Sequence, residues 1–289
     1  MTLKNIIFLA FGVFSSTITA QEKGVYVEYE NKLISTQETT GVLIANNNHA
    51  LYKELPSSKK GELGVGQSPN GGNAVVYKPD VKESNYYKTK GSSLIYYTEY
   101  VVKDKTPYFV YDSIPELNWE LIPNQTDTIL GYICNKAKLK FRGSNLTAYY
   151  TNDISFSFGP WKFDGLPGLI LKISEDEYPN KIYWEAKKII FPYNEKSQLY
   201  PNKEKYTYSL KEFKIMSYNI YDKQAKEMQA KVENDAIKNN EQMSRGDRPK
   251  INKRPATVEK VYEWEIEGDI WLFYIDYLKK HPEYKIDKL

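Results

Sequence analysis

The chain has 289 residues, with 40 Lys and Arg against 37 Asp and Glu and a formal net charge of +3. This balance gives no whole-protein field that would attract nucleic acid, and the length suits one substantial core or two small ones. Its 26 tyrosines outnumber its 11 phenylalanines. Since tyrosine favours strands with one apolar face and one wet edge, the composition predicts a mainly antiparallel β protein.

The first 20 residues are typical of an export signal. Lys4 gives a cationic start, residues 6–14 an apolar core, and residues 15–20 a small-residue cleavage site ending at Ala20. Gln21 follows instead of cysteine, which disfavours a lipoprotein anchor. We therefore expect an exported domain over residues 21–289, in the periplasm, on the periplasmic face of the outer membrane or secreted, with no later transmembrane segment.

Strand-like runs dominate the first two thirds of this domain. They are rich in β-branched and aromatic residues and are separated by Gly, Pro, Asn and Asp. The glycine-rich residues 61–72 are expected to form a mobile surface loop instead. The predicted strands are residues 25–30, 74–77, 93–102, 106–111, 132–141, 146–151, 169–173 and 181–190.

The clearest hairpin is predicted over residues 132–151, with its turn at residues 142–145. Alternation along its first strand predicts a buried face, comprising Ile133, Ala137, Leu139 and Phe141. The same alternation places Cys134 on the solvated face with Lys136, Lys138 and Lys140. A thiol beside cations could be reactive, but an isolated cysteine is more often a small buried hydrophobe, and we expect packing.

One long helix follows the strands. Ser209 with Glu212 makes a capping box at its start, and we expect its end near residues 239–240. Apolar side chains recur at three- and four-residue steps along it, at Phe213, Met216, Ile220, Tyr221, Ala225, Met228, Val232 and Ala236. The pattern predicts an amphipathic helix. Residues 258–266 then read as a closing strand or a helix, and residues 268–289 as a helical extension.

Between these segments, residues 245–255 form a basic, proline-bearing loop. Its cations would suit anionic lipid headgroups or lipopolysaccharide, although a solvated connection explains them equally well. They are Arg245, Arg248, Lys250, Lys253 and Arg254.

The sequence has few motifs typical of catalytic or metal sites. His49 and His281 are far apart and no zinc-ligand spacing occurs, nor does a Gly-x-Ser-x-Gly nucleophile elbow. Residues 175–177, Glu-Asp-Glu, are expected to be a solvated turn and not a calcium loop. We expect no cofactor and no metal. Carboxylates that converge only in space would escape detection in the sequence.

A glycine- and proline-rich corner precedes the strand at residues 169–173. In residues 166–169, Leu-Pro-Gly-Leu, Pro167 fixes φ near −65° and Gly168 accepts a positive φ, which predicts a type II turn. Aromatic side chains just upstream are expected to pack on this corner, at Phe156, Phe158, Trp161 and Phe163. No ligand is needed to explain it.

At these residues the sequence resembles the GLPGLI family, known largely from Bacteroidetes genomes. The hexapeptide that names the family stands here as Gly165, Leu166, Pro167, Gly168, Leu169 and Ile170. Further motifs in the family's order are residues 119–121, 131–137, 141–143, 148–151 and 157–160. The resemblance implies an exported envelope protein, often associated with genes for TonB-dependent outer-membrane receptors, and brings no established activity or catalytic residue.

Together these features predict a single α+β domain, mainly β: a curved antiparallel sheet or half-barrel with one long amphipathic helix packed on it. The favoured function is a non-enzymatic envelope protein that binds an apolar, lipid or peptide ligand and works with a TonB-dependent receptor. Two alternatives stay open. One is a hydrolase with a spatially assembled carboxylate or tyrosine site, and the other is a structural partner of an outer-membrane complex.

Overall fold

The computed structural model describes residues 24–33, 38–55, 63–67, 73–77, 83–100, 106–177, 182–194 and 198–217, with positions 220, 223, 227, 230, 234 and 259. The predicted export signal, the basic loop with Arg245, Arg248, Lys250, Lys253 and Arg254, and the C-terminal extension lie outside these residues. Of the segment 258–266, only Glu259 is described.

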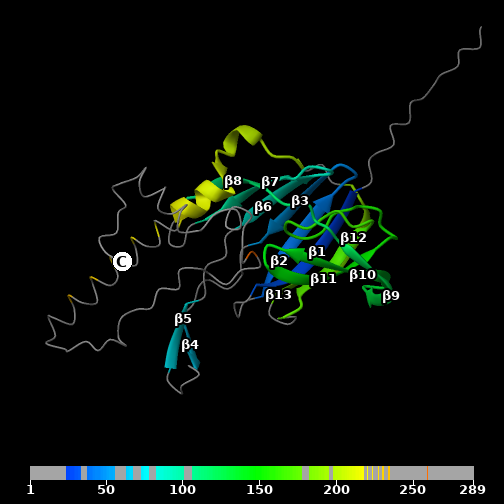
Figure 1. The fold of residues 1–289 in the computed structure, drawn as a ribbon, viewed down its shortest axis with the longest axis horizontal. Helices are drawn as coiled ribbons and strands as arrows, with labels where there is room; N and C mark the ends of the chain where they lie inside the picture. The colour runs from blue at the N-terminus through cyan, green and yellow to red at the C-terminus, as the bar shows by residue number, and fades with distance from the viewer. Residues whose placement is uncertain are drawn as a thin grey trace, which may run out of the picture.

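Twelve strands form one open sheet, here called the main sheet (Figure 1). Its order is β14-β8-β7-β6-β3-β2-β1-β13-β12-β11-β10-β9, and in the described part of the chain β14 and β9 are not paired with each other. All pairings are antiparallel except β14 with β8. The strands are β1 Gly24–Leu33, β2 Glu38–Ala45, β3 His49–Glu54, β6 Ser84–Thr89, β7 Leu94–Glu99, β8 Tyr108–Ser113, β9 Glu120–Ile129, β10 Tyr132–Phe141, β11 Ser144–Thr151, β12 Leu169–Glu175, β13 Ile182–Tyr193 and β14 Tyr208–Ser209.

A separate two-stranded sheet joins β4 (Leu63–Gln67) to β5 (Asn73–Tyr77). The prediction of a loop throughout residues 61–72 is therefore wrong for residues 63–67. A glycine-rich segment can still form a strand when a strong strand former such as residues 73–77 completes its backbone hydrogen bonds.

The buried apolar side chains form one large cluster against the main sheet. At its centre Trp184 is 1% exposed and stacks on Trp161, with the ring centroids 5.6 Å apart. Phe163 packs edge-on against both tryptophans. Phe156 and Phe158 are buried in the same cluster, so the predicted aromatic packing surface is confirmed. Burying each side chain of this size stabilises the fold by about 1.5–3 kcal/mol.

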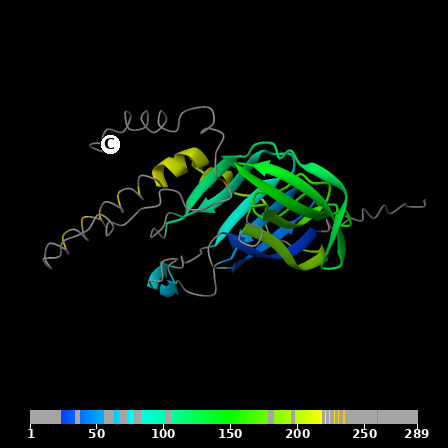
Figure 2. The same cartoon turned by 60° about the horizontal axis from the view of Figure 1, so that its bottom comes forward.

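Residues 210–217 are helical, as are the described positions from 220 to 234. The predicted capping box is confirmed, because the Glu212 carboxylate accepts from the Ser209 backbone N–H at 2.8 Å and Ser209 Oγ accepts from the Glu212 N–H at 3.3 Å. Leu210 and Phe213 are buried in the core cluster, and the Phe213 ring lies 5.6 Å from that of Tyr108 on β8. In both views the helix lies at the β8 end of the main sheet (Figure 2).

None of the described helical residues belongs to a helix that is long and apolar enough to cross a membrane.

Strand β10 departs from strict alternation. A bulge between Asn135 and Lys136 shifts its register against β9, so Cys134 is fully buried whereas Ile133 is 65% exposed. The predictions that Cys134 shares the lysine face and that Ile133 is buried are therefore wrong. Residues 123–125 of β9 lie opposite this single step of β10, and the alternation of β10 breaks there. Burial raises the pKa of the Cys134 thiol to about 11, which agrees with a packing role.

Candidate functional site

The segment that links β11 to β12, residues 152–168, is here called the corner segment. It folds back on itself through a bridge between Phe158 and Asp164, and the Gly165 N–H donates to the Ser157 carbonyl at 3.0 Å. Leaving the segment, the Ile170 N–H donates to the Phe158 carbonyl at 3.0 Å. The corner segment is therefore an ordered loop fixed to the start of β12.

The glycines of this corner have different roles from those the sequence predicts. Gly165 has φ +86°, whereas Gly168 is not among the residues with positive φ, so the predicted type II turn with Gly168 at its third position is wrong. Gly168 is needed for space instead. A Cβ there would lie 2.0 Å from the carbonyl oxygen of Thr151. The close approach of two backbones, and not a left-handed conformation, excludes larger residues.

A buried lysine and a tryptophan anchor the corner segment. Lys88 on β6 is 1% exposed, and its ammonium donates to the carbonyls of Gly159 at 2.6 Å and Phe163 at 2.7 Å. Burial lowers the pKa of Lys88 to about 8. Trp119, just before β9, donates from its indole Nε1 to the Asp164 carbonyl at 2.8 Å. These bonds satisfy backbone carbonyls that a buried loop would otherwise leave unpaired.

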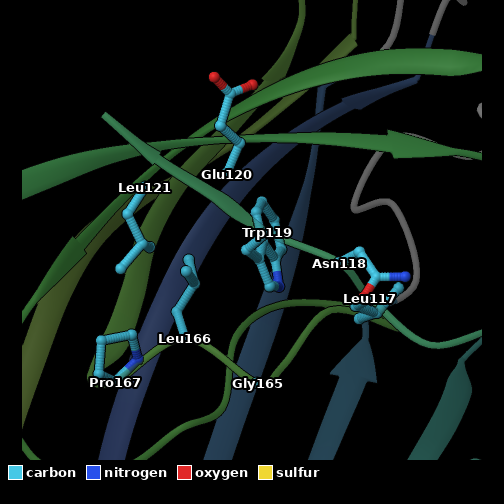
Figure 3. A pocket seen from close by; sticks show the side chains of 8 residues that line it. All are labelled: Leu117, Asn118, Trp119, Glu120, Leu121, Gly165, Leu166 and Pro167. Carbon is cyan, nitrogen blue, oxygen red and sulfur yellow. The ribbon is translucent and has the colours of Figure 1, made fainter. Parts of the chain in front are cut away.

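A surface pocket of about 410 Å³ opens between the corner segment and the start of β9 (Figure 3). The Trp119 ring and Leu166 lie next to each other in it, while the Glu120 carboxylate points away from them. Leu121 on the rim is 52% exposed, although Leu166 is 1% exposed. The lining residues are Leu117, Asn118, Trp119, Glu120, Leu121, Gly165, Leu166 and Pro167. We call this the corner pocket.

The corner pocket adjoins an edge of the main sheet. In the described part of the chain β9 pairs only with β10, and the pairing shifts between Thr126 and Ile122, beside Pro123 and Asn124. Asn124 has φ +59°, and proline lacks the N–H that a ladder needs. From the pocket side, an added strand could therefore follow β9 over residues 120–122 before Pro123 and Asn124 interrupt the ladder. An apolar side chain in the pocket and a short backbone ladder are the contacts this geometry offers.

A cluster of buried charges lies behind the corner segment. Lys162 of that segment donates to Asp112 on β8 at 2.9 Å and to Glu259 at 2.8 Å. Arg142 grips Asp112 with both terminal nitrogens, at 2.8 and 2.9 Å, and also donates to Glu259. The Lys162 ammonium lies 4.7 Å from the centre of the Tyr97 ring. We call Asp112, Arg142, Lys162 and Glu259 the charge cluster.

The ionisation of the charge cluster is fixed. Burial alone would raise the pKa of Asp112, but Lys162 and Arg142 outweigh it and lower this pKa to about 2. Burial alone would lower the pKa of Lys162, yet Asp112 and Glu259 raise it. The pKa of Glu259 is lowered because Lys162 and Arg142 outweigh its burial. With no group of the cluster close to exchanging a proton at neutral pH, the geometry suits a structural ion network and not acid–base catalysis.

Arg142 reaches the cluster from a tight turn. Arg142 and Gly143 have φ +43° and +84°, as in the type I′ turn that joins two-residue hairpins. Asn or Gly is usual at the first of these positions, and arginine is strained there. The bidentate pair with Asp112 compensates for that strain, so the same residue serves both the hairpin and the core.

The sequence motif and the structural site overlap in part. Of the hexapeptide, Gly165, Leu166 and Pro167 line the corner pocket, whereas Gly168, Leu169 and Ile170 are buried. The expectation that residues 175–177 form a solvated turn is wrong for Glu175, which is fully buried at the end of β12 and accepts from the Ser144 hydroxyl at 3.1 Å.

Several residues of the site were not predicted from the sequence. One signal for them was present. Asp112 on β8 alternates with the buried apolar residues Val110 and Ile114, and a charge in such a row needs a partner. Lys162 likewise stands within an aromatic run. Trp119 stood out only through the motif at residues 119–121, and Lys88 and Glu259 gave no signal.

A family model matches residues 141–172. It is described as a protein of unknown function (Porph_ging), and the matched residues include the hexapeptide Gly165 to Ile170. No curated protein matches the chain.

Among solved structures, the "Structure of PNGF-II in P21 space group" aligns with a TM-score of 0.44 and 15% identity. The "Structure of PNGF-II in C2 space group" aligns with a TM-score of 0.42 and 14% identity. Each alignment covers 68% of this chain and 33% of the other, so the chain spans about a third of the length of those structures.

Proposed function

We propose that this chain is an exported, non-catalytic envelope protein whose corner pocket binds an extended peptide segment through one apolar side chain. The observation that carries the proposal is the placement of the pocket, formed by Trp119, Leu121 and Leu166 beside the edge of β9. Its volume of about 410 Å³ lies at the low end of the range of small-ligand sites, roughly 300–1,000 Å³, and suits one large side chain better than a whole lipid.

The predicted export signal and the resemblance to the GLPGLI family support an envelope location for this function. As that resemblance implies association with TonB-dependent receptors, we expect the bound segment to belong to such an outer-membrane receptor. The pocket then gives the hexapeptide a role besides packing, since its first three residues form one wall.

A curved sheet or half-barrel also belongs to the proposal. Eight strands separate β8 from β10 in the main sheet, so in a flat sheet with about 4.8 Å per step they would lie about 43 Å apart. The 2.8 Å ion pair between Asp112 on β8 and Arg142 after β10 supports strong curvature. The core contacts of Leu210, Phe213, Met216 and Ile220 support an amphipathic helix packed against this sheet.

Peptide display tests the proposed binding. The immobilised full chain is expected to enrich extended sequences with a central apolar residue, and Leu121→Glu is expected to lose them because it places a carboxylate on the pocket rim. Ile133→Glu is the matched control, since Ile133 is also exposed but does not line the pocket. Enrichment that survives Leu121→Glu, or none at all, would contradict the proposal.

A hydrolytic function has one observation in its favour. Burial, together with the charge of Glu99, raises the pKa of Glu54 to about 7, where a carboxyl can both give and accept a proton. Hydrolysis of ester, glycoside or peptide substrates, with an apparent pKa near 7 that Glu54→Gln removes, would support this second candidate. Hydrolysis unchanged in Glu54→Gln would exclude Glu54 from the reaction.

A further inference from the structure

The four residues of the charge cluster come from distant parts of the chain. Asp112 lies on β8, Arg142 in the turn between β10 and β11, and Lys162 in the corner segment, so all three belong to the main sheet or to its connections. Glu259 follows Lys162 by 97 residues and is the only residue described after position 234. Glu259, which belongs to none of the strands of the main sheet, therefore supplies one carboxylate of the cluster.

The contacts of Glu259 are those of a bound carboxylate. Its Oε1 accepts from the Lys162 ammonium at 2.8 Å and from Arg142 Nη1. Both cations also hold Asp112, which occupies the bidentate face of Arg142. Lysine and arginine side chains arranged in this way recognise a carboxylate by charge-assisted hydrogen bonds. With Glu259 at 6% and Lys162 at 1% exposure, water screens this attraction little.

The charges of the cluster favour an anion at the position of Glu259. Within the cluster, two cations face two carboxylates. Removing Glu259 would take one negative charge out of a buried group in which Lys162 and Arg142 also hold Asp112. An uncompensated buried charge is far more costly than the loss of an exposed ion pair.

We propose that Arg142 and Lys162 form a carboxylate-binding site of the sheet, which the chain fills in cis with Glu259. The site would take any small carboxylate once Glu259 is removed. Through this site the Glu259 side chain is held to the sheet, independently of the corner pocket.

Chemical rescue tests this site. Glu259→Ala is expected to lower the Tm by roughly 5–15 °C, and sodium formate is expected to restore a large part of that loss with a saturable dose dependence. Sodium chloride at equal ionic strength should restore much less, because chloride cannot accept hydrogen bonds from Lys162 and Arg142 with carboxylate geometry.

Control variants separate charge from space. Glu259→Gln should also lower the Tm but should not respond to formate, because its amide fills the space without supplying a charge. Asp176→Ala removes an exposed carboxylate that accepts from Thr147 at 2.6 Å, and its Tm should be equal in formate and chloride.

If Glu259→Ala fails to accumulate in folded form, the variant is refolded from urea in formate and in chloride. Near-ultraviolet circular dichroism then measures how much native structure returns in each salt. Selective recovery in formate supports the site. An unchanged Tm in Glu259→Ala, or equal behaviour in the two salts, overturns it.

Discussion

Replacing Gly168 tests the geometry of the corner directly. A Cβ on Gly168 would lie 2.0 Å from the carbonyl oxygen and 2.7 Å from the carbonyl carbon of Thr151, where ordinary contact begins at 3.4 Å. The two backbones would have to separate by roughly 1.4 Å, the difference between ordinary contact and 2.0 Å. Because Thr151 pairs with Leu169, this movement disturbs the start of the β11–β12 ladder.

We expect Gly168→Ala to lower the free energy of unfolding by about 2–4 kcal/mol. Overpacking contributes about 1–3 kcal/mol, and a weakened backbone hydrogen bond about 1 kcal/mol. Equilibrium urea unfolding followed by tryptophan fluorescence measures the change.

Asparagine distinguishes a steric cause from a conformational one. Gly131 has φ +83° and no atom within 4 Å of an added Cβ, so Gly131→Asn should be milder than Gly131→Ala because asparagine tolerates positive φ. At Gly168, where space is limiting, Asn should be at least as harmful as Ala. A Gly168→Asn variant clearly more stable than Gly168→Ala would refute the steric reasoning.

Further predictions concern stability and reactivity. Leu130 and Arg142 both have positive φ in hairpin turns, yet Leu130→Asn should stabilise the protein by about 0.5–1 kcal/mol, whereas Arg142→Asn should destabilise it by about 3–5 kcal/mol because Asp112 loses its bidentate partner. Urea unfolding of both variants checks this, and equal signs would contradict it. The raised pKa of Glu54 favours folding below pH 4.5, and this contribution is lost as the pH rises towards 7, by at most about 3 kcal/mol. Glu54→Gln should therefore be more stable than wild type at pH 8 but not at pH 4.5, and a pH-independent difference would argue against it. The native Cys134 thiol should react with a disulfide reagent far more slowly than in urea, and labelling within seconds would show that it is accessible.

The sequence was most informative where the pattern is local. Tyrosine-rich runs, the hairpin over β10 and β11, and the Ser209 capping box depend on contacts between near neighbours, and the structure has them. The bulge at Asn135 depends on the pairing partner β9, a strand that the sequence did not reveal because its residues are mostly polar. An edge strand with no buried face lacks the alternation that predicts strands.

The site was harder to predict for the same reason. The hexapeptide was found, but its pocket also needs Trp119 and Leu121, which lie more than 40 residues earlier in the chain. Gly168 was expected at a turn position that needs a positive φ, and that prediction is wrong. Its actual constraint is the Thr151 carbonyl, a contact that only the folded chain creates.

Titrating Trp119 with peptide tests the central claim, that the corner pocket binds the apolar side chain of an extended segment. The protein is labelled with nitrogen-15 in its tryptophans, and the Trp119 indole signal is assigned by its absence in Trp119→Phe. That N–H donates to the Asp164 carbonyl, so its chemical shift reports on the pocket wall.

The probes are two capped pentapeptides, Thr-Val-Leu-Val-Thr and Thr-Val-Asp-Val-Thr. The leucine peptide is expected to shift the Trp119 signal in a saturable way, in wild type and in Ile133→Glu but not in Leu121→Glu, and the aspartate peptide to leave it unchanged. No shift with the leucine peptide, or equal shifts with both, would contradict the account.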